Sequence, residues 1–499
     1  MSQKGNVLFI TIDQMAVEVL SGPLAAHIKT PNFDRLAASG ASFANHFTVT
    51  VPCGPARASL LTGLYAMNHR AIRNGTPLAR HHATIATEAR KAGYEPLLFG
   101  YSDISPDPTG MDPEDPDLKT YEGVAPGFRE LVEMRLDDGL EWPAYLRAKG
   151  YEFEMDGARV HDIYRPRGPA NEPRPTDPAL YRAEDSDTAY LTDRTLQALD
   201  IRKNRPWFAH VTYIRPHPPL VAPAPYNAMI NPADLPRPDL DQPDHPFMGA
   251  WFSSAAATGL YWGFDGDCAA MTDTRISELR AVYLGLVAEV DHHIGRILDW
   301  LDSTGQAQNT LVVLTADHGE MLGQKRMWGK ESVFDAAYHV PLIIRDPHAT
   351  PGQKVTAMTE SVDIAPTILD WIGRTAPEAM DGRSLLPFAR GITADGWRDA
   401  VFLEADFGSA TNPTRFQNAL HLNDHQTGVS VLRETRWKYV HFGGGLPPML
   451  FDLATDPLET TNLAADPDFA PEIPRLARRL IDRMSERRDR RLTHFNLDG

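Results

Sequence analysis

A thiol and a permanent cation stand close together in the stretch CGPARASLLTG, residues 53–63. The second half of this stretch favours a helix, which we expect over Ser59–Leu64, just after Cys53. Backbone N–H groups and the dipole at a helix N-terminus favour negative charge, and Arg57 adds a fixed cation. This combination would stabilise an anion at Cys53. The alternative is a buried free cysteine beside a helix end.

Other polar side chains stand where short apolar runs end. Asp13 follows the run Val7–Ile12, and Asp317 and His318 follow Leu311–Thr315. Runs of this length, rich in β-branched residues, predict buried strands of a largely parallel sheet. Ligands bind beyond the carboxyl ends of the strands in such sheets, so these polar residues are candidate site residues. Three further runs have the same form: Pro96–Phe99, Trp207–Ile214 and Leu342–Ile344.

Helical and loop segments separate these runs. Residues 275–302 carry apolar side chains at three- and four-residue spacing and end before Gly305, which predicts one long amphipathic helix. The segments 104–118, 164–178 and 215–245 are rich in Pro and Asp. Long loops in a compact protein usually shape a ligand site. Strands alternating with helices predict an α/β fold.

The pattern changes near residue 390. Short strand-like runs precede one late helix, expected over residues 472–491, which is typical of an α+β unit. We therefore expect a catalytic α/β domain over residues 1–389 and a smaller C-terminal α+β domain over residues 390–499. The runs in the second unit are Ala400–Glu404, Val429–Arg433 and Trp437–Phe442.

The composition suits a large globular chain and excludes several classes of function. The chain has 499 residues, of which 42 % are hydrophobic and 23 % charged, which favours two domains with one large core. A net charge of −17 argues against a nucleic-acid partner held by bulk charge. The two cysteines, Cys53 and Cys268, argue against a disulfide scaffold and favour a reducing compartment.

Targeting and assembly signals are sparse. The N-terminal residues lack the basic and apolar regions of a signal peptide. No uncharged apolar stretch has transmembrane length. We therefore expect a cytoplasmic protein without a membrane partner. The late helix carries arginines among acids, which favours a solvated face or a subunit contact, and we expect a homodimer or homotetramer.

Together these motifs resemble those of the sulfatase family over nearly the whole chain. Cys53-x-Pro55-x-Arg57, followed by SLLTG, is similar to the family's signature for conversion of the cysteine to formylglycine. The resemblance implies that Cys53 becomes an aldehyde whose hydrate is the nucleophile. One hydrate oxygen attacks sulfur or phosphorus, and the other expels the bound group by re-forming the carbonyl. It also implies formylglycine-generating machinery as a partner and a small anionic ester as the substrate.

Further motifs follow in the family's order. Lys330, in Trp328-Gly329-Lys330, stands where the family has a sulfate-contacting lysine, and His217 resembles the histidine near the leaving group. The resemblance implies that both stabilise the developing charge, with His217 as the proton donor to the leaving alkoxide. It implies that Arg57 lowers the pKa of the nucleophile. Residues 450–463 resemble the family's closing motif.

The resemblance also implies one divalent metal, which acts as a Lewis acid. Its expected ligands are Asp13, Gln14, Asp317, His318 and the group formed from Cys53. The family commonly has a second aspartate in place of Gln14 and an asparagine in place of His318. Because all-oxygen sites suit Ca²⁺ whereas imidazole favours Mn²⁺, Zn²⁺ or Fe²⁺, we expect Mn²⁺, with Ca²⁺ as the alternative. The expected fold is alkaline-phosphatase-like, a large, mostly parallel sheet flanked by helices.

A second departure concerns the substrate. The family's Gly-Lys-x-His is replaced by Gly100-Tyr101-Ser102-Asp103, which removes one positive contact and one presumed base. A less positive site favours singly charged esters, which include sulfate monoesters and phosphonate monoesters. Gln14, Asn74 and Tyr101 resemble the phosphonate monoester hydrolase branch, in which Asn74 and Tyr101 would contact the non-bridging oxygens. Asp103 is the candidate base that takes the proton from the aldehyde hydrate. The alternative is that Asp103 only opens the turn that follows it.

These observations lead to three hypotheses. The first is an arylsulfatase that also accepts phosphonate monoesters and phosphodiesters. The second is a phosphonate monoester hydrolase and phosphodiesterase as the main activity, since both reactions need the same nucleophile and metal. The third is a metal-bound binding protein without catalysis, in which Cys53 stays a thiol.

Overall fold

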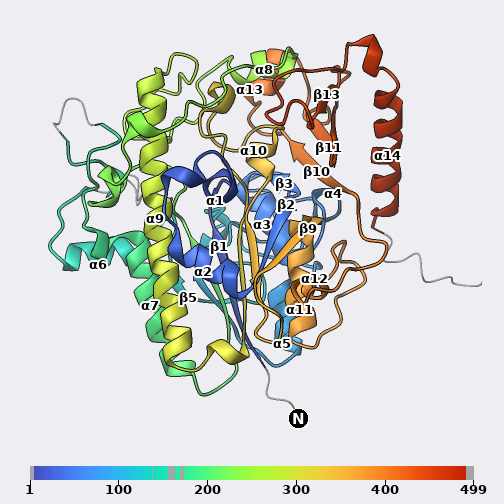
Figure 1. Cartoon of the computed structure of the whole chain (residues 1–499). Helices are drawn as coiled ribbons and strands as arrows, with labels where there is room; N and C mark the ends of the chain where they lie inside the picture. Colours follow the sequence, from blue (N-terminus) through green and yellow to red (C-terminus); the bar gives the residue numbers. More distant parts are fainter. Residues whose placement is uncertain (1–4, 138, 155–162, 169–173, 490–499) are drawn as a thin grey trace, which may run out of the picture.

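The computed structural model of the chain describes residues 5–137, 139–154, 163–168 and 174–489 (Figure 1). Its centre is an eight-stranded sheet with the order β5-β4-β6-β1-β7-β8-β2-β9. Its strands are β1 (Asn6–Ile12), β2 (Ala41–Phe47), β4 (Pro96–Gly100), β5 (Arg129–Glu133), β6 (Phe208–Tyr213), β7 (Thr310–Ala316), β8 (Leu342–Arg345) and β9 (Gln353–Glu360). All five predicted strands are present. The α/β fold is therefore confirmed.

Most neighbouring strands are parallel. β1 pairs in parallel with β6 and β7, and β4 pairs in parallel with β5 and β6. β8 differs, because it is antiparallel to both β7 and β2. The connection from β7 to β8 contains only the short helix α10 (Asp335–Tyr338) and a 3₁₀ turn. A parallel return usually runs through a helix that crosses one face of the sheet, and this connection has no such helix, so this strand departs from the parallel prediction.

Helices cover both faces of the large sheet. α9 (Asp273–Ser303) confirms the predicted long helix and packs with α7 (Asp187–Arg202) and α2 (Pro31–Ser39) (Figure 1). α5 (Ile85–Lys91), α11 (Ile364–Trp371) and α12 (Leu386–Ala389) lie on the opposite side. β1 is buried on both faces, with Leu8, Ile10 and Ile12 in one core and Val7 and Phe9 in the other.

The helix that carries the cysteine begins earlier than the sequence predicted. α3 spans Cys53–Thr62, so Cys53 is its first residue, and Gly63 ends it with a φ of +67°. Pro55 is tolerated because it lies in the first turn, where backbone N–H groups have no partner within the helix. All ten residues of α3 are buried. The thiol therefore lies at the N-terminus of a buried helix.

A second, five-stranded sheet has the order β13-β12-β11-β10-β3. Its strands are β3 (Thr50–Val51), β10 (Ala400–Asp406), β11 (Gly428–Glu434), β12 (Trp437–Phe442) and β13 (Met449–Asp452). This sheet fits the expected smaller C-terminal unit. It also takes in β3, which pairs in parallel with β10 and lies directly before Cys53. The boundary between residues 389 and 390 stays a prediction.

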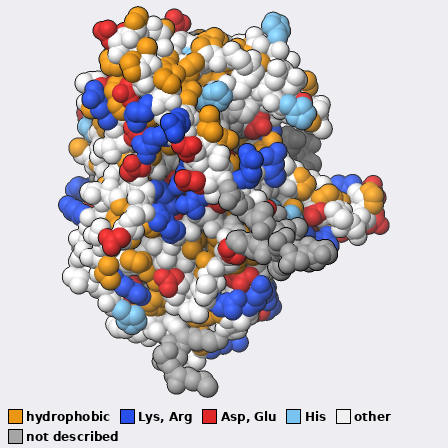
Figure 2. Space-filling view, turned by 90° about the vertical axis from the view of Figure 1, so that its right-hand side faces the viewer, with side chains coloured by type: hydrophobic (Ala, Val, Ile, Leu, Met, Phe, Trp, Pro, Cys, Tyr) orange, Lys and Arg blue, Asp and Glu red, His pale blue; other side chains and the backbone are white. Residues whose placement is uncertain are grey.

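The late helix α14 (Glu472–Glu486) packs on the second sheet and ends before the predicted residue 491. Residues 490 and 491 lie outside the described residues. Its arginines pair with acids: Arg475 and Arg479 both contact Glu434. Cationic and acidic side chains are interspersed on this face (Figure 2). The solvated-face interpretation therefore accounts for this helix, while the homodimer or homotetramer stays a prediction.

The predicted loops are largely irregular. Residues 104–118 contain one 3₁₀ turn, and residues 215–245 contain two. Part of 164–178 lies outside the described residues. Among the described helices, none combines the length and the apolar character needed to cross a bilayer.

The contact between α9 and the 3₁₀ turn η5 (Tyr226–Ala228) depends on a glycine. A Cβ atom at Gly285 would overlap the carbonyl oxygen of Tyr226. We predict that Gly285→Ala lowers the free energy of unfolding by about 1–3 kcal/mol, measured by urea denaturation. The control is Gly249→Ala in α8 (Pro246–Trp251), where a Cβ meets nothing within 4 Å. Equal stability of the two variants would contradict this packing.

Candidate active site

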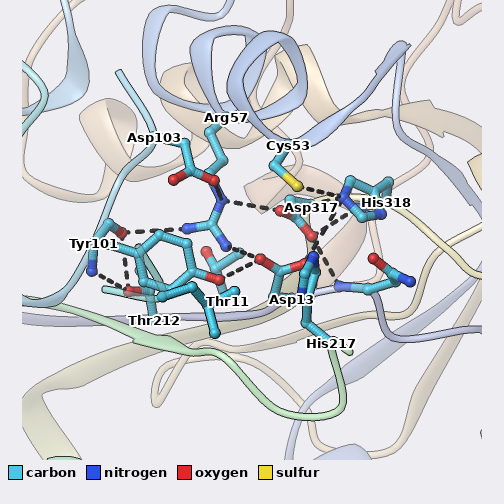
Figure 3. A network of polar contacts seen from close by, with 12 residues as sticks. Thr11, Asp13, Cys53, Arg57, Tyr101, Asp103, Thr212, His217, Asp317 and His318 are labelled. Carbon is cyan, nitrogen blue, oxygen red and sulfur yellow. Dashed lines mark hydrogen bonds and ion pairs between the residues drawn. The ribbon is translucent and has the colours of Figure 1, made fainter. Parts of the chain in front are cut away.

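Four predicted site residues come together at the carboxyl end of the large sheet. Ligand atoms of Asp13, Cys53, Asp317 and His318 all lie within 4.8 Å of one another, and all four residues are buried. Asp13 follows β1, Asp317 and His318 follow β7, and Cys53 begins α3 (Figure 3). Three segments far apart in sequence therefore supply one cluster.

The imidazole of His318 is oriented toward this cluster. Its Nδ1 lies 3.1 Å from the carbonyl oxygen of Gly319, to which it donates. Nε2 therefore carries no proton and faces the Cys53 Sγ at 3.1 Å and the carboxylates of Asp13 and Asp317 at 3.8 and 3.7 Å. Burial lowers the pKa of His318, which favours the neutral imidazole that binds metals.

This donor set fits a divalent metal. The Asp13 Oδ1 is buried and has no hydrogen-bond partner, although a buried carboxylate oxygen normally has one. The bonded Nδ1 of His318 is the usual outer contact of a ligating histidine. Two carboxylates, one imidazole and the Cys53 position could therefore hold one ion. The amide oxygen of Gln14 accepts from Lys330 at 2.6 Å, and its role as a ligand stays a prediction.

Arg57 neutralises the carboxylates of the cluster. It is 2 % exposed, and its Nε donates to Asp317 Oδ2 at 2.9 Å and its Nη2 to Asp13 Oδ2 at 3.1 Å. Its Nη1 donates to the carbonyl oxygen of Tyr101 at 3.2 Å. The expected lowering of the nucleophile's pKa by this guanidinium stays a prediction. Burial raises the pKa of the Cys53 thiol, and the cation that chiefly opposes this rise is Lys330.

Lys330 and His217 form one hydrogen-bonded pair. The Lys330 Nζ lies 3.0 Å from the His217 Nε2, and the His217 Nδ1 lies 2.6 Å from the carbonyl oxygen of Pro218. An ammonium can only donate, so His217 accepts at Nε2 and donates at Nδ1. Burial, followed by the charge of Lys330, lowers the pKa of His217 well below its ordinary value. In the resting pair the shared proton therefore lies on Lys330; the role of His217 as proton donor to the leaving alkoxide stays a prediction.

Gln14 is held in one orientation by its two neighbours. Its Nε2 donates to the Glu320 carboxylate while its Oε1 accepts from Lys330. A carboxylate cannot donate and an ammonium cannot accept, so the amide cannot flip. Glu320 also accepts from the backbone N–H of Gly329 at 2.6 Å. It therefore fixes the loop that carries Lys330.

The remaining predicted residues contact Gly54, Asp13 or Arg57. The Asn74 Oδ1 accepts from the backbone N–H of Gly54 at 2.8 Å. The Tyr101 hydroxyl donates to Asp13, so its expected contact with substrate oxygens stays a prediction. Asp103 is buried with a φ of +50°, and its Oδ2 lies 3.6 Å from the Arg57 Nε. Burial raises the pKa of Asp103 well above its ordinary value; its role as a base stays a prediction.

A pocket of about 390 Å³ opens above the Lys330–His217 pair. Its walls come from the second sheet, from α8 and from connecting loops, and they include Gln14, Pro52, Arg73, Asn74, His217, Trp251, Leu260, Trp328, Lys330, Phe407 and Arg415. The C-terminal unit supplies Phe407 and Arg415. The pocket therefore combines aromatic side chains with polar and charged ones.

Comparison with known proteins identifies the family. The sulfatase family model matches residues 5–374, which is most of the chain. The chain belongs to the sulfatase family. A second model, described as N-sulphoglucosamine sulphohydrolase, C-terminal, matches residues 323–487. The expected alkaline-phosphatase-like fold is confirmed by the solved structures that match.

Individual known proteins match over almost the full length. The multifunctional alkaline phosphatase superfamily protein PehA of Trinickia caryophylli is 38 % identical over 98 % of this chain and 97 % of its own. The phosphonate monoester hydrolase SpPMH from Silicibacter pomeroyi has a TM-score of 0.94 at 48 % identity, covering 99 % of this chain and 98 % of its own. That of Agrobacterium radiobacter has a TM-score of 0.93 at 40 % identity, with the same coverage. This sulfatase family member is a hydrolase of sulfate or phosphonate esters.

Several residues of this sulfatase site were not predicted. Glu320 directly follows the Asp-His-Gly motif, so its position was a usable signal. Arg73 lines the pocket and directly precedes the predicted Asn74, so its position was also a usable signal. Trp251 and Phe407 line the pocket as well, but the sequence around them carries no motif. They reach the pocket only through the packing of the second sheet and of the loops.

The charge balance at Arg57 generates a stability prediction. Arg57→Gln would leave buried carboxylates without their cation, so we predict a loss of about 3–5 kcal/mol in metal-free protein. Arg35→Gln is the control, because Arg35 also pairs with two carboxylates, Asp299 and Asp302, but at the surface. Its loss should be about 1 kcal/mol or less. Urea denaturation with a chelator present measures both; a small loss for Arg57→Gln would contradict the assignment.

Proposed function

We propose that the chain is a metal- and formylglycine-dependent hydrolase of phosphonate monoesters and phosphodiesters, with sulfate monoesters as a second substrate class. This reverses the order of the two substrate classes that the sequence led us to expect, in which sulfate monoesters came first. The observation that carries the reversal is that two pairs of loops line the pocket, each pair joined by its own hydrogen bond; we call these pairs its two walls. The similarity to two phosphonate monoester hydrolases over nearly the whole chain supports the same order.

The first wall belongs to the His217 side. His217, Pro218 and Leu260 line the pocket, and the backbone N–H of Leu220 donates to the Leu260 carbonyl oxygen at 2.7 Å, which joins their two loops. The Lys330–His217 pair holds a proton at this wall and can donate it to the leaving oxygen. This wall therefore suits the leaving group.

The second wall belongs to the Asn74 side. Arg73, Asn74 and Phe407 line it, and the Arg73 Nη1 donates to the Gly408 carbonyl oxygen at 2.5 Å. A sulfate monoester carries one organic group, whereas a phosphonate monoester or phosphodiester carries two. A pocket with two walls therefore suits the phosphorus substrates.

The charge near the nucleophile favours a monoanion. Among the described residues that line the pocket base, Lys330 is the cation that reaches the Cys53 position. Arg57 is paired with Asp13 and Asp317 and is not available to the substrate. Singly charged esters therefore suit the site better than phosphate monoester dianions.

Each site residue has a proposed role in the reaction. Formylglycine formed from Cys53 would supply a geminal diol, one oxygen of which attacks while the other later expels the bound group. A divalent ion held by Asp13, Asp317 and His318, with Gln14 beside it, would supply Lewis-acid chemistry; its donor set favours Mn²⁺ over Ca²⁺. Lys330 and His217 hold the proton for the leaving oxygen. Asn74 lies beside Gly54 to contact a non-bridging oxygen, and Asp103 would accept the hydrate proton.

Relative specificity tests the substrate order. We predict a higher kcat/KM for 4-nitrophenyl phenylphosphonate than for 4-nitrophenyl sulfate, because only the phosphonate fills both walls. Steady-state kinetics with the same leaving group isolates the retained part of the substrate. A ratio that favours sulfate would restore the arylsulfatase hypothesis.

The identity of residue 53 tests the nucleophile. We predict that protein from a host with formylglycine-generating machinery carries an aldehyde at Cys53, detected by peptide mass spectrometry. Cys53→Ala should lower kcat by more than about 100-fold, because the attacking group is lost. Cys268→Ala alters the other buried cysteine, which belongs neither to the metal cluster nor to the lining of this pocket, and should retain activity. Unmodified Cys53 without turnover would favour the binding-protein hypothesis.

A further inference from the structure

The turn that carries His217 has few hydrogen-bond donors of its own. Residues 215–219 read RPHPP, and the three prolines lack a backbone N–H. The N–H of His217 donates to the Ile214 carbonyl oxygen at 2.9 Å. Buried carbonyl oxygens need partners, so those of this turn must find donors on side chains.

Arg215 supplies these donors. Its Nη1 lies 2.8 Å from the carbonyl oxygen of His217 and 2.9 Å from that of Pro219. The residue is fully buried, with 0 % exposure. One guanidinium nitrogen therefore binds the turn on both sides of Pro218, whose own carbonyl oxygen accepts from the His217 Nδ1.

The guanidinium is itself held rigidly. Its Nε donates to Asp187 Oδ2 at 2.9 Å, at the first residue of α7. The Tyr164 hydroxyl donates to the same oxygen at 2.9 Å, and the Tyr164 ring lies 4.0 Å from the guanidinium carbon. A planar cation fixed by an ion pair and a ring face cannot move without breaking several contacts. The turn is thus fastened to a helix outside the active site.

These contacts determine where the imidazole points. The main chain is fixed at residues 217 and 219, and the Nδ1 bond to Pro218 sets the ring. Nε2 then meets the Lys330 Nζ at 3.0 Å. We propose that Arg215 is a positioning residue that holds His217 against Lys330, so that the shared proton reaches the leaving oxygen as the ester bond breaks. The proton transfer in this inference rests on the proposed function, whereas the contacts that hold His217 do not depend on it.

A purely structural role is the competing explanation, and the chain offers a matched control. Arg398 is also buried and pairs with Asp363 and Glu360, and it does not line the pocket. Loss of either guanidinium removes a buried cation. Only Arg215 contacts the turn that carries His217.

The experiment measures kcat/KM for a series of phenylphosphonate esters with leaving groups from 4-nitrophenol to phenol and a simple alcohol. The variants are Arg215→Lys, His217→Ala, the double variant and Arg398→Lys. Lysine keeps a positive charge for Asp187 but cannot bind both carbonyl oxygens and the carboxylate together. Tyr164→Phe, which removes one hydroxyl that orients Asp187, is the milder variant if Arg215→Lys does not fold. Thermal unfolding is recorded for every variant.

We expect Arg215→Lys to lower kcat/KM about 10- to 100-fold for the poor leaving groups and much less for 4-nitrophenol. Good leaving groups need little protonation, so their rates should be nearly independent of the proton donor. Tyr164→Phe should change the same leaving groups in the same direction by less. The double variant should be no slower than His217→Ala alone, because Arg215 acts through His217. Arg398→Lys should lower thermal stability without changing the leaving-group dependence.

Two results would overturn the inference. One is an equal loss for all leaving groups in Arg215→Lys, as expected for a structural role. The other is additive losses in the double variant, which would show that Arg215 acts independently of His217. If His217→Ala leaves the leaving-group dependence unchanged while the double variant stays non-additive, the proton role of His217 fails and the positioning by Arg215 stands.

Discussion

Three buried carboxylates share one guanidinium, and the site depends on this contact. Arg57 lies 2.9 Å from Asp317, 3.1 Å from Asp13 and 3.6 Å from Asp103. Carboxylates at the ends of neighbouring strands repel one another in a low-dielectric interior. The guanidinium offsets that repulsion and leaves the Asp13 Oδ1 without a partner.

The same contact also places the cysteine. Cys53 and Arg57 are four residues apart on α3, and residues at this spacing lie on one face of a helix. When Arg57 reaches the carboxylates, Cys53 must face the same cluster, where its Sγ lies 3.1 Å from His318. The spacing in the Cys-x-Pro-x-Arg motif thus has a structural meaning besides its resemblance to a modification signal. The charge of −17 on the whole chain does not describe this interior, where Arg57 and Lys330 balance the acids.

The sequence predicted what depends on local patterns. The strands β1 and β7 are continuous apolar runs, so the placement of Asp13, Asp317 and His318 at their ends could be anticipated. Contacts between distant segments could not. Arg57 and Asp317 are 260 positions apart, and nothing near Arg57 indicates that it binds carboxylates. The antiparallel direction of β8 and the pairing of β3 with β10 are likewise results of tertiary packing.

We expect Arg57 and its carboxylates to form a site for one divalent ion at the Cys53 position. Calorimetric titration of chelator-treated protein with Mn²⁺ tests it most directly, because it requires neither substrate nor turnover. We expect one ion per chain, and at least tenfold weaker binding for Asp13→Asn and for His318→Ala, since each removes a ligand atom. Absence of binding, or equal binding by the three proteins, would contradict it.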